Sequence, residues 1–526
     1  MQSNRPGRIG IAAFALVGIW SIGHGQTVRP VALTGAAAPG TIDGVSFAAF
    51  LGMPSIDELG RVAFASVLTG SSVTGTNDSG IWAETSGALD KIARTGDQVP
   101  DAPIGVTYGS FPIHNPLSMN GIGHVAFLAT LSGSGITSSN AQALMLASGV
   151  GGVSTVVRNG GQVPGWSSVA TLADIAFDAS PALNDSGVIT WRGELSRAGQ
   201  IGTRTGIWSF DPAGGIRSIA EEGATLVPGP DGGIVQTLFH QPILSATGEV
   251  AFVAGVNASS NNAVVQSDGF SSRVRARAVS PNSVSNNDGG DIAFHSSGIH
   301  VVRDGEGSTV IADSNISAPG TESGTTFLGI ANDTTLNASG HTVLAASLKG
   351  PAVTSARDSG LWTNRSGALE LLAREGDSAP DTVDMARFGS FNSVPPMNNS
   401  DQIVVLARLT GDTVHSGNDT GIWVAEGTSG LRLFLREGDL LDVSDDSSAP
   451  DLRTIASFGF VDDFAPYDGR GTLLNDAGEF AFQATFTDGS SGIFVGTIPA
   501  PGGIAPLTAI AVAAALQRST RRSRCN

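Results

Sequence analysis

Cysteine, lysine and tyrosine are almost missing from this chain of 526 residues. Its one cysteine is Cys525, its lysines are Lys91 and Lys349, and its tyrosines are Tyr108 and Tyr467. A single cysteine excludes a disulfide framework within the chain, so packing or bound metal ions must supply the stability. Charged residues make up only 14%, and the net charge of −18 argues against a protein held to nucleic acid by the backbone phosphates.

Glycine and proline are plentiful, with 70 and 25 residues, and 41% of the chain is apolar. This composition predicts many short strands and turns. It provides too many apolar residues for a disordered chain, and they are too scattered for a protein that spans a membrane many times.

Residues 1–25 have the order of a secretory signal peptide. Arg5 and Arg8 precede an apolar run over residues 9–22, and small residues then lead to a cleavage position before Gln26. The alternative is a buried N-terminal helix or strand. The pattern predicts a protein that the export machinery carries to the cell surface, the outer membrane or the extracellular space.

Residues 499–526 read as a sorting or anchor segment. Pro499, Pro501 and Gly502 precede an apolar stretch that is shorter than the roughly 20 residues of a stable membrane span. Arginines, including Arg521 and Arg522, follow it. The segment resembles the PEP-CTERM sorting signals of Gram-negative bacteria, which implies an exosortase-type partner, although alanine stands where that signature has glutamate. The alternatives are a retained anchor or a frayed tail.

One pattern returns eight times along residues 26–498. It consists of Asn or a substitute, two variable residues, Gly, two variable residues, and Ala-Phe or an equivalent pair. The copies begin at Asp57, Asn120, Asn184, Ser245, Asn287, Asn337, Asn398 and Asn475. Intervals of 42 to 77 residues are too uneven for a strict solenoid but suit blades joined by variable loops.

Each copy predicts antiparallel hairpins. Asn and Gly tolerate the left-handed backbone of tight turns, so Asn-x-x-Gly joins two strands. Further turns lead to Gly-Ile-Trp or a variant of it, as at residues 80–82 and 360–362, and some copies add a third pattern, as at residues 92–97. Four strands per repeat are the content of a propeller blade.

The last repeat lacks the third pattern, and the segment around residues 31–35 matches what is missing. Pairing this N-terminal strand with the last repeat would close a ring and remove exposed sheet edges. We therefore predict an all-β fold, an eight-bladed β-propeller of four-stranded blades over residues 26–498. Two smaller propellers or tandem β domains are the alternatives.

The repeats resemble the NxxGxxAF tandem-repeat proteins of bacterial surfaces, whose C-terminal anchors vary. That resemblance covers nearly the whole exported segment and implies a surface location without an assigned activity. The resulting hypothesis is a non-enzymatic binding or structural module of the envelope or matrix, with an extracellular glycan or protein as partner. The alternative is a propeller hydrolase or lyase acting on extracellular polysaccharide.

An acidic segment lies in the longest interval between repeats. Carboxylate oxygens are the ligands that Ca²⁺ prefers, so this segment is a candidate calcium site, with a solvated acidic loop as the alternative. Its candidate ligands are Asp439, Asp442, Asp445, Asp446, Asp451, Asp462 and Asp463. Residues 286–291 are a second, weaker candidate.

Three further sets of residues favour structural roles. Arg94, Arg374 and Arg436 each stand three residues before an Asp, which predicts ion pairs or arginine-to-carbonyl bonds that hold turns, with an anion site near the channel as the alternative. His295 and His300 are expected to be ordinary strand residues. Asp78, Asp358 and Asp419 precede Gly-Ile-Trp or a variant and resemble the structural Asp-boxes of sialidase propellers.

Overall fold

The architecture follows from a computed structural model. It describes residues 20–22, 26–85, 87–112, 117–149, 152–162, 170–175, 181–197, 202–228, 233–257, 261–281, 283–303, 305–391, 393–444, 448–459 and 473–498.

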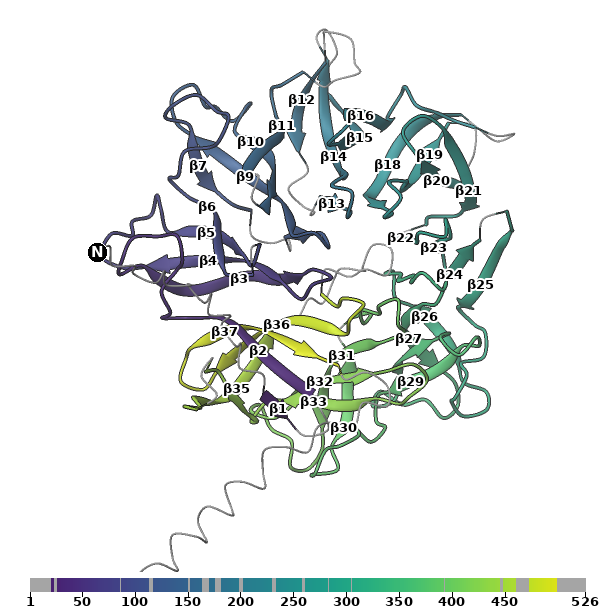
Figure 1. Ribbon diagram of the computed structural model, residues 1–526. Coiled ribbons are helices and arrows are strands. Elements are labelled where there is room, and N and C mark those ends of the chain that lie inside the picture. The colour runs from purple at the N-terminus through teal and green to yellow at the C-terminus, as the bar shows by residue number, and fades with distance from the viewer. Residues whose placement is uncertain are drawn as a thin grey trace, which may run out of the picture.

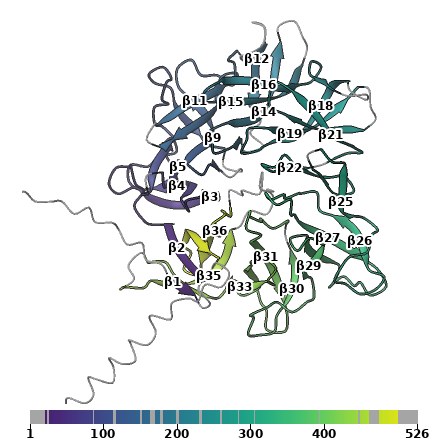
Figure 2. The same cartoon turned by 45° about the vertical axis from the view of Figure 1, so that its right-hand side comes forward.

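Eight antiparallel sheets follow one another around a ring in the described part of the chain (Figures 1 and 2). The molecule is an all-β, eight-bladed propeller, as the repeats predict. The two alternative arrangements, paired small propellers and a string of β domains, are wrong, because the eight sheets form a single closed ring.

Blades 1 to 4 hold the first half of the chain. Blade 1 consists of β3 (Ser46–Ile56), β4 (Val62–Thr69), β5 (Ser79–Ala83) and β6 (Asp90–Arg94). Blade 2 consists of β7 (Thr107–Ser110), β8 (Ser118–Met119), β9 (His124–Ser132), β10 (Gln142–Ser148) and β11 (Val153–Arg158). Blade 3 consists of β12 (Ala170–Ile175), β13 (Ala182–Leu183), β14 (Ile189–Arg197), β15 (Thr203–Asp211) and β16 (Gly215–Glu221). Blade 4 consists of β17 (Leu226–Val227), β18 (Gly233–Leu244), β19 (Val250–Val256), β20 (Asn262–Ser267) and β21 (Ser272–Ala278).

Blades 5 to 8 hold the second half and the N-terminal strands. Blade 5 consists of β22 (Val284–Asn286), β23 (Ile292–His295), β24 (Gly298–Val302) and β25 (Ser308–Asp313). Blade 6 consists of β26 (Thr326–Ile330), β27 (Val343–Lys349), β28 (Ser359–Thr363) and β29 (Glu370–Arg374). Blade 7 consists of β30 (Arg387–Phe391), β31 (Ile403–Thr410), β32 (Thr420–Ala425) and β33 (Arg432–Arg436). Blade 8 consists of β34 (Leu440–Asp442), β35 (Leu452–Gly459), β36 (Glu479–Phe486), β37 (Ser491–Thr497), β2 (Gln26–Leu33) and β1 (Trp20–Ile22).

The N-terminal strand closes the ring. β2 pairs antiparallel with β37 from Thr27 opposite Thr497 to Leu33 opposite Gly492, beside the yellow C-terminal strands in Figure 1. This pairing confirms the predicted closure, with a strand that begins earlier than expected, at Gln26. The short strand β1, which lies within the predicted signal peptide, pairs with the start of β2.

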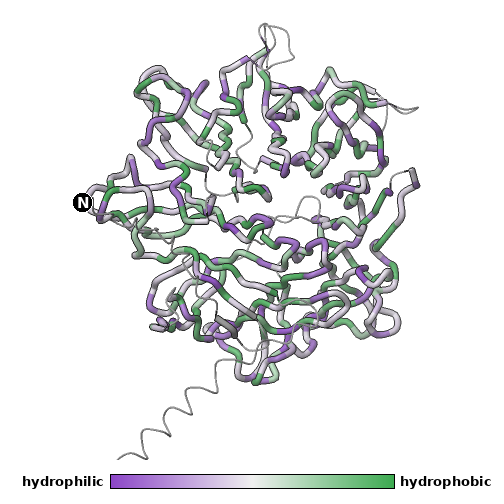
Figure 3. The backbone as a smooth tube through the Cα atoms, viewed as in Figure 1, coloured by the Kyte–Doolittle hydropathy of each residue, from purple (hydrophilic) through white to green (hydrophobic). Residues whose placement is uncertain are grey.

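The apolar core is divided among the boundaries between neighbouring blades. One cluster joins the strands of blade 1 that carry Phe64 and Trp82 to the closing strands of blade 8, which contribute Ile493. Another joins blades 6 and 7 around Leu361 and Trp423. Figure 3, which is coloured by the hydropathy of each residue, shows apolar segments along the strands of the blades. Among the described residues, no helix is long and apolar enough to span a membrane.

Three tryptophans of the Gly-Ile-Trp pattern and its variant are fixed in the core by a hydrogen bond. Nε1 of Trp82, Trp362 and Trp423 donates a hydrogen bond of 3.0–3.2 Å to the backbone carbonyl of a proline 43 residues earlier. These indoles are fully buried, so the bond satisfies a donor that would otherwise lack a partner. They are core residues of their blades.

Candidate functional site

Each repeat turn is held by the side chain of its first residue. In Asn184, Oδ1 accepts hydrogen bonds from the backbone N–H groups of Ser186 (3.1 Å) and Val188 (2.9 Å). Asn337 and Asn398 make the same two contacts in their own turns. An asparagine suits this position because its carbonyl oxygen accepts within the turn while its amide group remains a donor.

These amide groups donate across the boundaries between blades. Each reaches the backbone carbonyl of the first motif residue in the next blade, at 2.8–3.2 Å; the donors are Asn120, Asn184, Asn287, Asn337, Asn398 and Asn475. The last of them, from Asn475 to Asp57, joins residues 418 positions apart and closes the circle. We call this set of turns and bonds the motif ring.

Asp57 begins the first motif and has no amide to donate. Its carboxylate accepts from Arg61 Nε at 2.7 Å, and the Arg61 guanidinium in turn donates to the backbone carbonyl of Gly121 in blade 2 at 3.5 Å. The arginine therefore provides the donor that the aspartate lacks, and the contact to the next blade is kept.

A second set of bonds runs parallel to the first, one residue further along each turn. The backbone N–H of one turn donates to the side-chain oxygen of the next turn, as in Gly121 to Asp185, Ala246 to Asp288, Ala338 to Asn399, Asn399 to Asp476 and Asp476 to Glu58. One of these bonds bridges the boundary at which Ser245 replaces asparagine. The acidic residues of this position are thus already engaged in holding turns.

The motif glycine is needed for two reasons. It has a left-handed backbone, with φ of 73° at Gly60 and 80° at Gly478, and at these two positions a side chain of the preceding blade lies directly against it. A methyl group on Gly60 would overlap the carboxylate of Glu479, and one on Gly478 would overlap the amide of Gln402. A larger residue at Gly60 or Gly478 would therefore have to adopt a strained left-handed backbone and displace the facing side chain of the preceding blade.

Asp401 occupies the glycine position in the seventh motif. Its φ of 59° is unfavourable for an aspartate, but its carboxylate accepts a 2.7 Å bond from Asn337 Nδ2 and lies 2.7 Å from Nδ1 of His341. These contacts come from the preceding blade, so the strained residue adds a further link to the ring.

The motif ring lies around the middle of the molecule. The strands β13 and β22, which lead into two of its turns, lie near the centre of the ring of blades in Figure 1. The polar groups of the turns are spread over all eight blades, and those described above bind their neighbours. They form a uniform belt of contacts.

The family of unknown function DUF7453 matches residues 7–505. The chain belongs to this family. None of the curated proteins matches it. The match and the fold show a propeller family of unknown function, and the resemblance to the NxxGxxAF repeat proteins of bacterial surfaces stays a prediction.

Several solved structures are similar in fold. They include a mutant of puromycin hydrolase (13% identity, TM-score 0.36, covering 82% of this chain and 58% of that one). A second is an oligogalacturonate lyase in complex with manganese (10% identity, TM-score 0.35, covering 71% of this chain and 86% of that one). A third is the Dos1 propeller (10% identity, TM-score 0.36, covering 84% of this chain and 93% of that one). The chain spans little more than half the length of the puromycin hydrolase. At these identities the likeness concerns the fold alone.

The acidic residues of the candidate calcium site lie partly within the described chain. Asp442 is buried and accepts bonds from the backbone N–H groups of Ser444 and Asp451 through Oδ1. Asp439 accepts from a backbone N–H, and Asp451 pairs with Arg453 at 2.7 Å. In the residues that the structure covers, no three His, Cys, Asp or Glu side chains gather as a metal site would require.

The remaining calcium candidates fall elsewhere. Asp445, Asp446, Asp462 and Asp463 lie outside the described residues, as do Tyr467 and the sorting-signal residues Pro499, Pro501, Gly502, Arg521 and Arg522. In the second candidate segment, Asn287 Oδ1 accepts from the Asp291 N–H within the fifth motif turn, and the Asn287 amide and the Asp288 carboxylate bind the neighbouring turns.

The three repeated arginines hold turns at the outer strands of their blades. Nε of Arg94, Arg374 and Arg436 donates to a backbone carbonyl 17 or 18 residues earlier, at 2.7–3.2 Å. Two of their carboxylate partners differ from the expected ones: Arg374 pairs with Glu322, and Arg436 binds Asp384 through two 2.9 Å bonds. The aspartates of the pattern have other contacts, because Asp377 pairs with Arg357 at 3.0 Å and Asp439 accepts from the Arg436 backbone N–H at 2.8 Å.

The histidines and Asp-box residues also serve the fold. His300 stacks on Phe294 at 5.0 Å and binds the Ser296 carbonyl, while burial lowers the pKa of His295. The backbone carbonyls of Asp78, Asp358 and Asp419 accept 2.6–2.7 Å bonds that close their hairpins. Tyr108 is buried in the core between blades 1 and 2.

Sequence reasoning missed an ion pair at the closing boundary. Arg29 on β2 binds the carboxylate of Glu84 in blade 1 through two bonds of 2.7 and 3.0 Å, and it also donates to the Gly60 carbonyl. These partners are 55 and 31 residues away and belong to no repeated pattern, so the sequence contained no signal for them.

A carboxyl pair in blade 7 makes stability sensitive to pH. Burial, followed by hydrogen bonding and the charge of Asp419, raises the pKa of Glu437 to about 7. The folded protein thus holds a proton that the unfolded chain releases near pH 4.5. The resulting stabilisation is complete below about pH 4.5 and is lost as the pH rises towards 7.

We expect Glu437→Gln to stabilise the protein at pH 8 by about 2 kcal/mol and to change little at pH 4.5. The glutamine resembles the protonated acid, which keeps the bond to the Thr420 N–H and does not repel Asp419. Urea unfolding at both pH values measures the difference. An equal effect at the two pH values would contradict it.

Proposed function

We propose that the protein is an exported, surface-associated module with a binding or structural role in the cell envelope or extracellular matrix, and that it is not an enzyme. The motif ring carries this proposal. An active site needs polar groups that converge on one reacting atom, whereas here the polar groups of the turns are distributed evenly and bind neighbouring blades.

The two ends of the chain support the location. In this proposal residues 1–25 are a signal peptide that the export machinery removes, and residues 499–526 are the sorting segment for an exosortase-type enzyme. The end segments contain arginines but no acidic residues, so the segment between them is more acidic than the whole chain, whose charge is −18. Such a surface suits a hydrated layer and disfavours nucleic acid as a partner.

The test is to express the chain in a Gram-negative host and to recover it from the envelope and the medium. We expect the recovered protein to begin at Gln26 and to release no new reducing ends or unsaturated products from neutral and acidic polysaccharides. Intracellular retention with an uncleaved N-terminus would overturn the location. Heat-sensitive product formation would overturn the non-enzymatic role and favour a hydrolase or lyase.

A further inference from the structure

A depression of about 350 Å³ opens at the boundary between blades 6 and 7. Its volume lies in the range of small-molecule sites, about 300–1,000 Å³. Blade 6 supplies small residues from three strands, and blade 7 supplies one aromatic ring: the lining includes Gly329, Ala331, Ala345, Ser347, Ser359 and Phe391.

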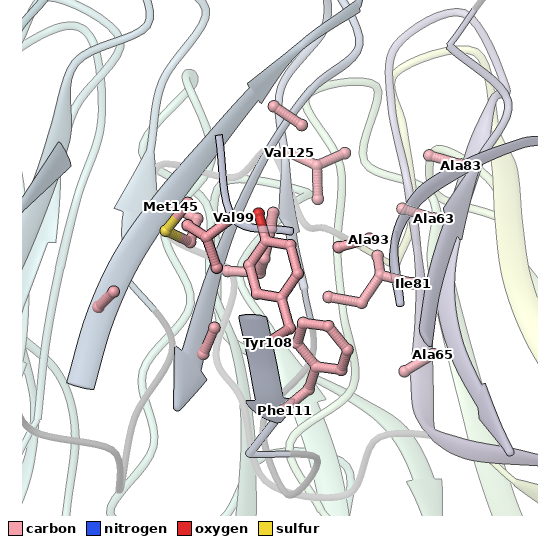
Figure 4. Packing of buried hydrophobic residues seen from close by; sticks show 14 of the residues in the cluster. Ala63, Ala65, Ile81, Ala83, Ala93, Val99, Tyr108, Phe111, Val125 and Met145 are labelled. Carbon is pink, nitrogen blue, oxygen red and sulfur yellow. The ribbon is translucent and has the colours of Figure 1, made fainter. Parts of the chain in front are cut away.

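The same place between blades 1 and 2 is filled. There Leu51, the counterpart of Ala331, packs against the apolar cluster, and Phe111 is only 5% exposed. Figure 4 shows Phe111 and Tyr108 together in this packed boundary, near Ala65 and Ile81. Phe391 occupies the position of Phe111, since each ring lies beside the aromatic residue three positions earlier, at 5.3 and 5.5 Å.

The boundary between blades 6 and 7 differs from the boundary between blades 1 and 2 in a row of residues that are cross-strand neighbours. In blade 1 the row is Ala49, Val67, Ser79 and Thr95; in blade 6 it is Gly329, Ser347, Ser359 and Glu375. Three of these four positions, together with Ala331 in place of Leu51, are smaller or more polar in blade 6. The exchanges remove apolar volume and place the Ser347 hydroxyl on the wall of the depression, while Glu375 lies behind this wall, bonded to Ser359.

The groups that face the opening suit a sugar ring. Phe391 is half-buried and lines the depression together with Ser347 and Ser359. Ser347 donates to the Gly329 carbonyl at 3.3 Å, and Ser359 donates to Glu375 Oε2 at 3.1 Å. Both hydroxyl oxygens can still accept hydrogen bonds from ligand hydroxyls.

The charged residues beside the depression disfavour an anionic ligand. Asp358 and Glu375 lie next to Ser359, and the Asp358 N–H donates to Glu375 Oε2 at 3.3 Å. Arg357, the nearest cation along the chain, is already paired with Glu322 and Asp377. A sugar that carries a carboxylate or sulfate would meet repulsion here, whereas a neutral ring would not.

We propose that the depression between blades 6 and 7 binds a neutral hexopyranose unit of an extracellular glycan. One face of the sugar stacks on Phe391, and its hydroxyl groups bind Ser347 and Ser359. That the ligand belongs to an extracellular glycan rests on the proposed function. Binding of the sugar unit itself can be tested in solution independently of that function.

The experiment is saturation-transfer NMR on the purified full-length protein with the methyl glycosides of glucose, galactose and mannose. We expect at least one to bind with a dissociation constant of about 1 mM, as for a shallow site with few hydrogen bonds. Ala331→Leu fills the depression with the residue found in blade 1, so it is expected to weaken binding at least tenfold while the thermal midpoint stays equal or rises. Ser347→Val, which likewise introduces the residue found in blade 1, should weaken binding as well.

Leu51→Ala is the matched control. It enlarges the corresponding space between blades 1 and 2 without adding the polar row, so binding should remain at the wild-type level. Glucuronate and glucosamine are measured in the same way as charged probes. The proposal is overturned if no neutral glycoside binds at high millimolar concentration, if only these charged sugars bind, or if Ala331→Leu binds like the wild type. None of these results would affect export or the absence of catalysis, which are measured separately.

Discussion

A chain that begins at Gly35 is expected to lose its cooperative unfolding transition. It lacks β2, so the edge of β37 loses its partner strand, and the buried Val28 and the Arg29–Glu84 ion pair are lost. The apolar residues beneath this strand would meet water. The combined cost is about 5 kcal/mol or more, comparable to the whole stability of a typical protein.

The matched control for this truncation is a circular permutant. Ile498 is joined to Gln26 through a short hairpin loop of about two to four residues, and the new chain starts at Gly35. Thr27 lies opposite Thr497, so the loop only has to connect neighbouring antiparallel ends. We expect the permutant to unfold near the wild-type midpoint in urea, whereas the truncated chain should not. Equal stability of the truncated chain would show that closure by β2 is dispensable.

Asn398→Ala is expected to destabilise the protein by about 3 kcal/mol. Asn398 is fully buried; its amide donates to the Asn475 carbonyl at 2.8 Å and to Gln402, and its Oδ1 accepts from two backbone N–H groups of its turn. Alanine leaves these buried groups without partners. Asn398→Asp keeps the acceptor but places a carboxylate against the Asn475 carbonyl, so it should be at least as harmful at pH 8.

The control is the neighbouring Asn399→Ala. Asn399 also reaches across blades, to the Ala338 N–H and to Asp476, but it is only half-buried and water can replace its bonds. We expect a loss of about 1 kcal/mol or less, measured by the same urea titration. Equal losses for the two variants would mean that the buried bonds of Asn398 stabilise the protein no more than the half-buried bonds of Asn399.

Much of the architecture could be predicted because hairpins are local. Asn120 and Gly123 lie three residues apart, and their turn depends on backbone conformations that these residue types favour. Counting such turns predicted eight blades, and the missing pattern after Phe494 predicted the closing strand.

The role of the motif asparagines and the partners of the arginines could not be predicted in the same way. Asn475 binds the carbonyl of Asp57, and Arg374 binds Glu322 rather than the nearby Asp377. Such contacts depend on which blade lies beside which and on how far each loop projects. A spacing in the sequence contains no information about either.

The depression between blades 6 and 7 illustrates the same limit. Ala331 and Ser347 are ordinary small residues in the sequence, and only the sheet register brings both to the depression that Phe391 also lines. The sequence by itself determined the strands, their turns, the number of blades and the way the ring closes, because these follow from short-range backbone preferences. Only the tertiary structure decided which polar groups stabilise the ring and which boundary remains open, because both depend on side chains that packing brings together from distant parts of the chain.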